Sequence, residues 1–263
     1  MFDTAGREVR VALTMVAERP TLLAELTWPA IERLVQGGET LCLLPVGATE
    51  QHGRHLPAST DTAIGEAICH GASRATGVPV LPALAISFSQ VHTTAWPGTF
   101  SLAPRTLIQV VVEIARWVSA SGFEKLLIVN AHVGNVGPLK VAVEEIRHEG
   151  AVRAGATNWW QLTPEIEAEL SADADDWHAN AAETALMLHL RPELVATDEI
   201  RDDPDRTGGL VLGYSVAETS RDGLTGAPSR GTEEGGARLY DAAVAALAGV
   251  VERARREQPP SLD

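Results

Sequence analysis

Short apolar runs alternate with longer amphipathic segments along most of the chain. Residues 40–46 and 125–130 are mostly apolar from end to end, which is typical of strands buried on both faces of a parallel sheet. Residues 104–121 instead repeat an apolar position every three or four residues, from Pro104 to a stop at Gly122. This spacing predicts an amphipathic helix between the two strands.

The same alternation extends over the rest of the chain. Thr27 and Asp61 stand where helix N-caps are expected. Residues 78–86, VPVLPALAI, are strand-like, but their prolines predict an edge strand or an interrupted one. The other expected elements are helices at 27–36, 61–75, 136–148 and 183–190, a strand at 151–160, an irregular glycine-rich region at 198–236 and an alanine-rich helix to about 256.

This order of elements predicts an α/β fold, with a mostly parallel sheet covered by helices on both faces. Ligands of such sheets bind beyond the carboxyl ends of the strands. Glu50 and His52 follow the strand at 40–46, and His132 follows the strand at 125–130. We therefore expect these two loops to converge on one crevice.

Composition narrows the class of protein. A chain of 263 residues, 45% hydrophobic and 21% charged, is expected to form a single domain over 1–263. Its formal net charge of −14 disfavours nucleic acid, which is bound through Lys and Arg contacts with phosphates. No apolar run reaches the ~18 residues of a membrane helix, and no signal-peptide pattern is present, so we expect no membrane partner and a cytoplasmic location. Cys42 and Cys69 lack metal or redox spacing and are expected to be core thiols.

Carboxylates and imidazoles gather at the ends of the apolar elements. Such side chains are the donors that Zn, Mn and Fe dications accept. If the acids are Glu50, Asp61 and Glu183, their three negative charges oppose the four positive charges of two dications. The one positive charge that remains can be balanced by a hydroxide. A two-metal hydrolytic site is thus one interpretation of the set Glu50, His52, Asp61, His132, His178 and Glu183.

Each of these residues also has a structural interpretation. Glu50 or Asp61 alone is more often a solvated loop acid or a helix cap, and His132 can satisfy a backbone carbonyl. Of His52 and His55, one can serve only to orient the other. Position along the chain does not choose between these alternatives.

Several other residues favour a structural role. Asn135 can end a strand and turn the chain, and Pro97-Gly98 suits a type II turn, although backbone at this point can also approach a substrate. Trp177, with the tryptophan pair at 159–160, can wall a pocket for a planar amide, but core packing is the preferred interpretation. Surface or partly buried positions on helices are expected for His70, His148 and His189.

Four motifs in order give the chain a family resemblance. LPVGATEQHGRHLPASTDT (44–62), WPGTFSL (96–102), VNAHVGN (129–135) and HANAAET (178–184) resemble the creatininase family of metal-dependent amidohydrolases, and GAPSRGTEEGG (226–236) is similar to its C-terminal segment. The resemblance implies a three-layer α/β/α fold, two divalent metal ions per chain (Zn, Mn or Fe), a small-molecule amide substrate and a homo-oligomer, hexameric in creatininase itself.

The resemblance also implies ligand roles. Glu50 and His132 match ligands of one metal, and His52 and Glu183 match ligands of the other. Asp61 matches the residue that bridges the two ions.

Further roles carry over in the same way. His178 resembles the catalytic histidine that precedes the ligand glutamate. His55 matches a motif histidine that orients a ligand through its ring N–H. Trp177, Gly98 and Asn135 are the remaining candidates for substrate binding or for support of the ligands.

Departures from the family pattern bear on the substrate. Arg54 replaces the usual proline, and Ala131 and Val133 replace glycines. Creatininase proper carries a tyrosine and a glutamate directly after its motif histidine, where this chain has Val133 and Gly134. Creatinine itself is therefore disfavoured.

Several substrate classes and one other class of protein remain open. Hydrolysis of a small or cyclic amide C–N bond is the leading hypothesis. A formamide deformylase and a peptidase that matures a peptide precursor are the alternatives within the family. The alternative that is not an enzyme is a catalytically silent, metal-binding assembly subunit. Such a protein would lack a metal ligand or His178, and the sequence lacks neither.

Overall fold

The computed structural model describes residues 19–92 and 95–261. In this part of the chain the sheet has three parallel strands in the order β1 (Leu41–Val46), β2 (Lys125–Asn130) and β3 (Arg153–Asn158). The register pairs Leu41 with Lys125 and Val46 with Asn130, so β1 and β2 end level with each other. The loops that follow them therefore leave the sheet at the same edge.

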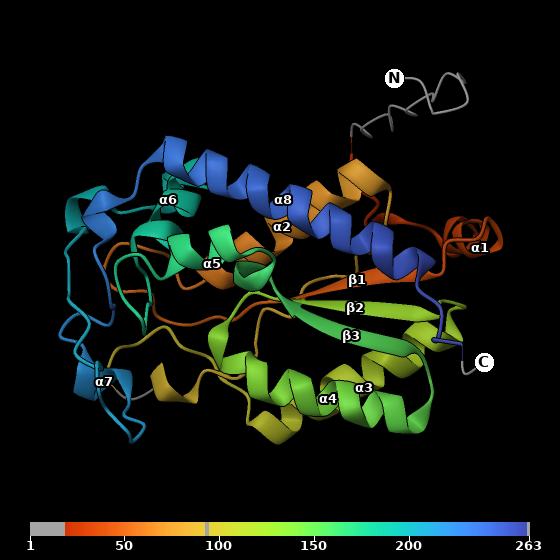
Figure 1. Ribbon diagram of the computed structural model, residues 1–263, viewed down its shortest axis with the longest axis horizontal. Helices are drawn as coiled ribbons and strands as arrows, with labels where there is room; N and C mark the ends of the chain where they lie inside the picture. Colours follow the sequence, from red (N-terminus) through yellow and green to blue (C-terminus); the bar gives the residue numbers. More distant parts are fainter. Residues whose placement is uncertain (1–18, 93–94, 262–263) are drawn as a thin grey trace.

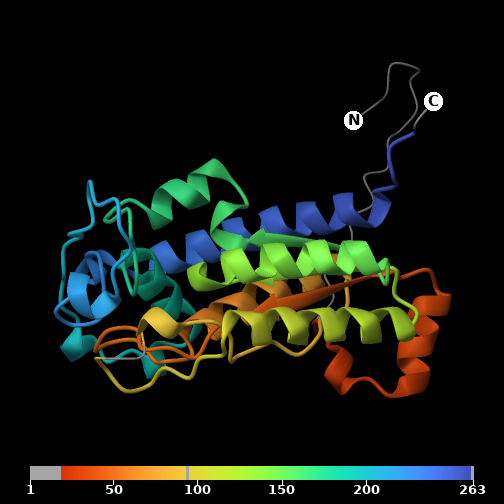
Figure 2. The ribbon, with the colours of Figure 1, turned by 90° about the horizontal axis from the view of Figure 1, so that it is seen from below.

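Helices cover both faces of this sheet. Figure 1 shows α2 (Thr60–Thr76), α6 (Ala181–Leu190) and α8 (Glu233–Arg256) on one side, and α3 (Pro104–Ala120) and α4 (Val136–Glu149) on the other. Figure 2 shows α3 and α4 side by side, seen from below. One buried apolar cluster fills each interface between sheet and helices. The predicted three-layer α/β/α fold is confirmed.

The winding of the chain reverses at β1. After α2, residues 78–84 run along the outer edge of β1 through isolated parallel bridges, Val80 with Leu43 and Leu84 with Val46. The chain then crosses to the opposite side of β1 to form β2. The predicted interrupted strand is confirmed, because Pro79 and Pro82 offer no N–H to a ladder. The carboxyl end of β1 is thus a topological switch point, where α/β sheets bind ligands.

Two predictions of local structure were wrong. Asp61 is not the N-cap of α2, because the N-cap position is Ser59 and Asp61 lies in the first turn. Its carboxylate lies against imidazoles rather than against helix N–H groups. The strand expected at 151–160 ends at Asn158, and the two tryptophans begin the 3₁₀ turn η4 (Trp159–Gln161).

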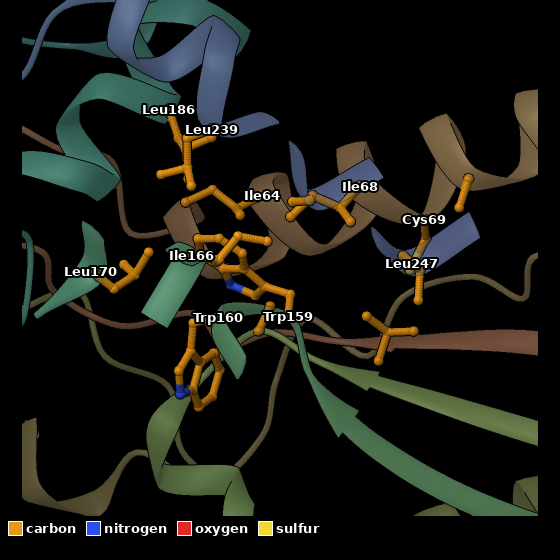
Figure 3. Packing of buried hydrophobic residues seen from close by; sticks show 14 of the residues in the cluster. Ile64, Ile68, Cys69, Trp159, Trp160, Ile166, Leu170, Leu186, Leu239 and Leu247 are labelled. Carbon is orange, nitrogen blue, oxygen red and sulfur yellow. The ribbon is translucent and has the colours of Figure 1, made fainter. Parts of the chain in front are cut away.

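The tryptophan pair belongs to the core, as preferred from the sequence. Trp159 and Trp160 are buried, and Figure 3 shows them among Ile64, Ile166 and Leu170 beneath the helical layer. The remaining elements are η1 (Leu23–Glu25), α1 (Trp28–Gln36), η2 (Gln90–His92), η3 (Val133–Asn135), α5 (Pro164–Leu170), η5 (Pro192–Leu194), η6 (Thr197–Glu199), α7 (Val216–Thr219) and η7 (Pro228–Arg230).

Other expectations concern burial and membranes. Cys42 and Cys69 are buried free thiols, as expected. Among the helices of the described residues, none is both long and apolar enough to cross a membrane.

Candidate active site

The carboxyl edge of the sheet brings the predicted ligands together. Glu50 and His52 lie in the loop after β1, Asp61 lies in the first turn of α2, and His132 lies two residues beyond the end of β2. Glu183 lies in the first turn of α6. All five side chains are buried, and most of them line one cavity of about 190 Å³.

One group of donors consists of Glu50, Asp61 and His132. His132 Nε2 lies 3.0 Å from the carbonyl oxygen of Phe88, to which it can donate. Its Nδ1 lies 3.2 Å from Asp61 Oδ2, and Glu50 Oε2 lies 3.3 Å from Nε2. A histidine held this way by a backbone carbonyl presents its other nitrogen to a metal in a fixed orientation.

A second group forms around His52, on the other side of Asp61. His52 Nδ1 lies 3.1 Å from the carbonyl oxygen of Glu50, so Nε2 faces the acids, 3.1 Å from Asp61 Oδ1 and 3.8 Å from Glu183 Oε1. The carboxylate of Asp61 therefore has one oxygen toward each imidazole. This is the arrangement expected of a bridging ligand.

A strained turn sets the position of Glu183. Ala179 has φ of +50°, a conformation uncommon for a residue with a side chain, and its N–H donates to Glu183 Oε2 at 2.7 Å. The side chain of Asn180 caps α6 by accepting from the Glu183 N–H at 3.1 Å. The other oxygen of Glu183 is left to face His52.

The donor set fits divalent metal ions. Within the described part of the chain, Glu50 Oε1, Glu50 Oε2 and Asp61 Oδ2 are buried and accept no hydrogen bond. Buried carboxylate oxygens are normally satisfied, because an unpaired buried charge costs several kcal/mol. Oxygen and imidazole donors within 4.8 Å of one another match the chemistry of Zn and Mn sites.

Charge coupling among these groups shifts their pKa values in opposite directions. Burial raises the pKa of Glu50 to about 7, with Asp61 adding to the rise. Burial opposes protonation of His132, but Glu50 and Asp61 raise its pKa to about 9. Burial also favours the neutral form of Asp61, yet His52 and His132 hold its pKa well below the usual value. Without a metal, protons therefore occupy the imidazoles that an ion would need.

His178 lies at the edge of both groups and lines the same cavity. Its Nε2 lies 2.9 Å from the carbonyl oxygen of Gln51, and its Nδ1 lies 3.7 Å from Glu50 Oε1. Burial, with the nearby imidazoles of His92 and His52, lowers its pKa well below the usual value. The ring is therefore neutral and presents Nδ1 to the acids.

The remaining predicted residues lie around this centre. His55 is buried, and its Nε2 lies 2.9 Å from Oγ1 of Thr184, the neighbour of Glu183 on α6. A role for His55 in orienting a ligand stays a prediction. Asn135 donates to the carbonyl of Gly47 at 3.0 Å and accepts from the Phe88 N–H at 3.2 Å.

Trp177 and Gly98 differ in their relation to the cavity. Trp177 lines it, with its ring edge-on to Trp160 at a centroid distance of 5.8 Å. Gly98 has φ of +112°, which favours glycine, and it is not among the described residues that line the cavity. The next residue, Thr99, accepts from the Gln51 N–H at 3.0 Å, so this turn supports the loop after β1.

Two residues of the site were missed from the sequence. His92, in η2, lines the cavity, and its ring lies 4.4 Å from that of His178. The amide nitrogen of Gln51 lies 3.1 Å from His92 Nδ1 and 3.2 Å from His178 Nε2, so its side chain contacts both rings. Gln51 stands between two predicted ligands, Glu50 and His52, and this position was the one signal that could have found it. His92 lies in a 3₁₀ turn of only three residues, which is too short to show a periodic pattern in the sequence.

The fold and the donor set together define an α/β/α hydrolase with a site for divalent metal. The chain belongs to the creatininase family: the family model for creatininase, described as creatinine amidohydrolase, matches residues 24–251. Members of this family are hydrolases that act on amide bonds, and this chain is a creatininase-family amidohydrolase.

Relatives cover most of the chain. Creatinine amidohydrolase of Pseudomonas putida is 28% identical over 92% of this chain and 99% of its own length. The mycofactocin precursor peptide peptidase of Mycolicibacterium smegmatis is 34% identical over 83% of this chain and 86% of its own length. A solved structure of creatinine amidohydrolase has a TM-score of 0.78 at 29% identity, and it covers 92% of this chain and 99% of that chain.

Proposed function

We propose that this amidohydrolase uses two divalent metal ions, one held by Glu50, Asp61 and His132 and the other by His52, Asp61 and Glu183. The observation that carries the proposal is the set of buried, unpaired carboxylate oxygens of Glu50 and Asp61 facing two imidazoles that backbone carbonyls orient. Solved creatininases with Zn or Mn support these metals as candidates, with Fe as a third.

When bound, the ions would supply Lewis acidity and would lower the pKa of the attacking water toward ~7. The protein's own residues would bind the ions and move the protons. Asp61 and Glu50 concentrate negative charge where the ions would bind, and Asp61 would be the ligand common to both. The neutral ring of His178 offers Nδ1 at 3.7 Å from Glu50 Oε1, where it can take the proton that the attacking water loses and pass it to the leaving nitrogen.

The proposed substrate is a small or cyclic amide whose C–N bond is cleaved. A cavity of about 190 Å³ suits a small group at the reacting carbon. Creatinine itself remains disfavoured, because Val133 and Gly134 replace the tyrosine and glutamate of creatininase proper. A formamide group on a larger molecule satisfies the same requirement for a small reacting end.

A peptide substrate is the second candidate, and the mouth of the cavity favours it. The cavity is lined by Val91 from η2, by Val133 from η3, by Tyr214 just before α7 and by Val216 at the start of α7. Val91, Val133 and Tyr214 also expose 50%, 50% and 47% of their surface. An apolar rim of this kind suits a substrate that extends past the reacting bond. The 34% identity to a precursor peptide peptidase points the same way.

The setting in the cell belongs to the same proposal. By analogy with its family, we infer a cytoplasmic homo-oligomer, for which a hexamer is the first size to test by sedimentation. The formal net charge of −14 supports the absence of nucleic acid among its partners.

The test is amide hydrolysis by metal-free protein reloaded with Zn or Mn, on a panel of creatinine, a formamidopyrimidine and a peptide. We expect turnover of one member that a chelator abolishes and metal restores. His178→Asn should keep the bound metal and lose most of the rate, whereas His148→Asn, at an exposed position on α4, should leave the rate unchanged. Turnover that survives complete removal of metal would contradict the proposal.

A further inference from the structure

Gln51 is buried, and its side chain contacts the imidazoles of both His92 and His178 beside the proposed metal site. Two backbone groups fix the orientation of its amide. The Gly53 N–H can only donate, and it lies 3.1 Å from Gln51 Oε1. The Gly223 carbonyl can only accept, and it lies 2.9 Å from Gln51 Nε2. The second N–H of this amide is therefore free to donate elsewhere.

That second N–H determines the tautomer of His92. Gln51 Nε2 lies 3.1 Å from His92 Nδ1, and since the amide nitrogen donates, Nδ1 must accept. The proton of the neutral ring is then on Nε2. His92 Nε2 lies 3.9 Å from Glu50 Oε1, too far for a hydrogen bond, so this N–H remains available at the cavity.

The backbone of Gln51 determines the tautomer of His178. The carbonyl oxygen of Gln51 can only accept, and His178 Nε2 lies 2.9 Å from it, so Nε2 carries the proton. The 3.2 Å approach of Gln51 Nε2 to His178 Nε2 is then a contact between two donors and not a hydrogen bond. Both rings share the Nε2–H tautomer, but they are oriented differently. His178 therefore offers the lone pair of Nδ1 to the cavity, and His92 offers its Nε2–H.

The tautomer of His92 distinguishes it from the metal ligands. Geometry alone groups Glu50, His92 and His178 as a possible metal site. A nitrogen that carries a proton cannot bind an ion, and the other nitrogen of His92 is occupied by Gln51. His92 is thus suited to donate a hydrogen bond, for example to an oxygen on which negative charge develops.

We propose that Gln51 is a positioning residue that holds His92 in the Nε2–H tautomer, and that His92 donates this N–H to the carbonyl oxygen of the amide substrate. The second half rests on the proposed amide hydrolysis. The site then has a base and a hydrogen-bond donor of the same residue type, distinguished by the contacts of one glutamine.

The tautomers are measured directly by long-range ¹H–¹⁵N correlation on protein with ¹⁵N-labelled histidine, metal-free and loaded with Zn. The chain has eight histidines, so His92→Phe and His178→Asn assign the two signals. We expect the Nε2–H pattern for His92. In Gln51→Glu the new carboxylate only accepts, so His92 should move its proton to Nδ1, whereas His178 should keep its pattern because it bonds the backbone. The control Gln109→Glu, at an exposed position on α3, should change neither ring.

A second variant avoids the added charge. Gln51→Met has similar length and no donor, and it should leave His92 as a mixture of tautomers. An unchanged Nε2–H pattern for His92 in both Gln51 variants would overturn the positioning role. Direct coordination of His92 in the Zn-loaded protein, seen as a zinc-bound nitrogen shift, would overturn it as well.

Kinetics test the contact with substrate. His92→Phe should lower kcat about 100-fold with bound metal and KM little changed, and His92→Gln, which retains an N–H donor, should recover part of the loss. Equal kcat for His92→Phe and the wild type would overturn this role. If the wild-type protein hydrolyses no amide, the proposed function fails together with the substrate contact, while the tautomer measurement still decides the role of Gln51.

Discussion

Gly134 stands where creatininase proper carries a glutamate, and its surroundings leave no room for a side chain. A Cβ built at Gly134 would lie 2.5 Å from His132 Nε2 and 2.7 Å from the carbonyl oxygen of Phe88. These two atoms are hydrogen-bonded to each other at 3.0 Å. Any side chain at Gly134 therefore presses on the contact that orients His132.

The magnitude follows from these distances. An ordinary contact needs about 3.5 Å, so the imidazole of His132 would have to move by about 1 Å. That shift exceeds the ~0.5 Å tolerance within which a binding constellation works. Disturbing a group that orients a histidine ligand typically lowers metal affinity about 10- to 100-fold, or about 1.4–2.7 kcal/mol. We expect a loss in this range for Gly134→Ala.

The assay is a titration of metal-free protein with Zn in competition with a chelating dye. The matched control is Gly137→Ala on the neighbouring helix α4, where a Cβ would meet nothing within 4 Å. Gly137→Ala should bind Zn as the wild type does and should be slightly more stable, since alanine favours helix. Wild-type affinity in Gly134→Ala would refute the claim that His132 is a ligand held by Phe88.

Three further predictions concern the bridge, the pH dependence and the fold. Asp61→Asn loses the charge of the side chain but keeps its shape, and it should bind less than one equivalent of metal and lose turnover. The exposed control Asp241→Asn should behave as wild type in both assays. Two tightly bound ions in Asp61→Asn would contradict the bridging role. The raised pKa of about 9 for His132 means that its protonated form stabilises the metal-free fold fully below pH ~6.5 and that this contribution disappears as pH rises through about 9. The thermal midpoint of metal-free protein should therefore fall between pH 6.5 and 9.5 while Zn affinity rises, and the opposite trend would refute the assigned charge state. Lys125 Nζ donates to three carbonyls at the end of α8, each at 2.8 Å, so Lys125→Met should lower the free energy of unfolding by about 2–3 kcal/mol in urea titrations, and equal midpoints for it and the exposed control Lys140→Met would rule this out.

Much of the fold could be predicted because its elements carry strong local patterns. The apolar strands β1 and β2 and the periodic helix α3 appear at or near their expected residues. The loop after β1 was also informative, because Glu50 and His52 directly follow a strand whose carboxyl end is a natural ligand site. Glu183 was also among the candidate acids although it is 122 residues away from Asp61, and the motifs then matched it to a ligand of one metal.

What could not be predicted depends on contacts between segments far apart in the chain. Asp61 looks like a helix cap until the imidazoles of His52 and His132 are placed beside it. His55 matches a motif, but its partner Thr184 is 129 residues away. His92 reaches the site through a short 3₁₀ turn that has no sequence period, so only the assembled fold reveals it.

The most direct test of the central claim is a crystal structure of the protein grown with Mn, with anomalous scattering to locate the ions. The account predicts two peaks per chain, bridged by Asp61, with Glu50 and His132 on one ion and His52 and Glu183 on the other, at about 2.0–2.3 Å from their donors. A single peak, or two peaks that Asp61 does not bridge, would contradict it.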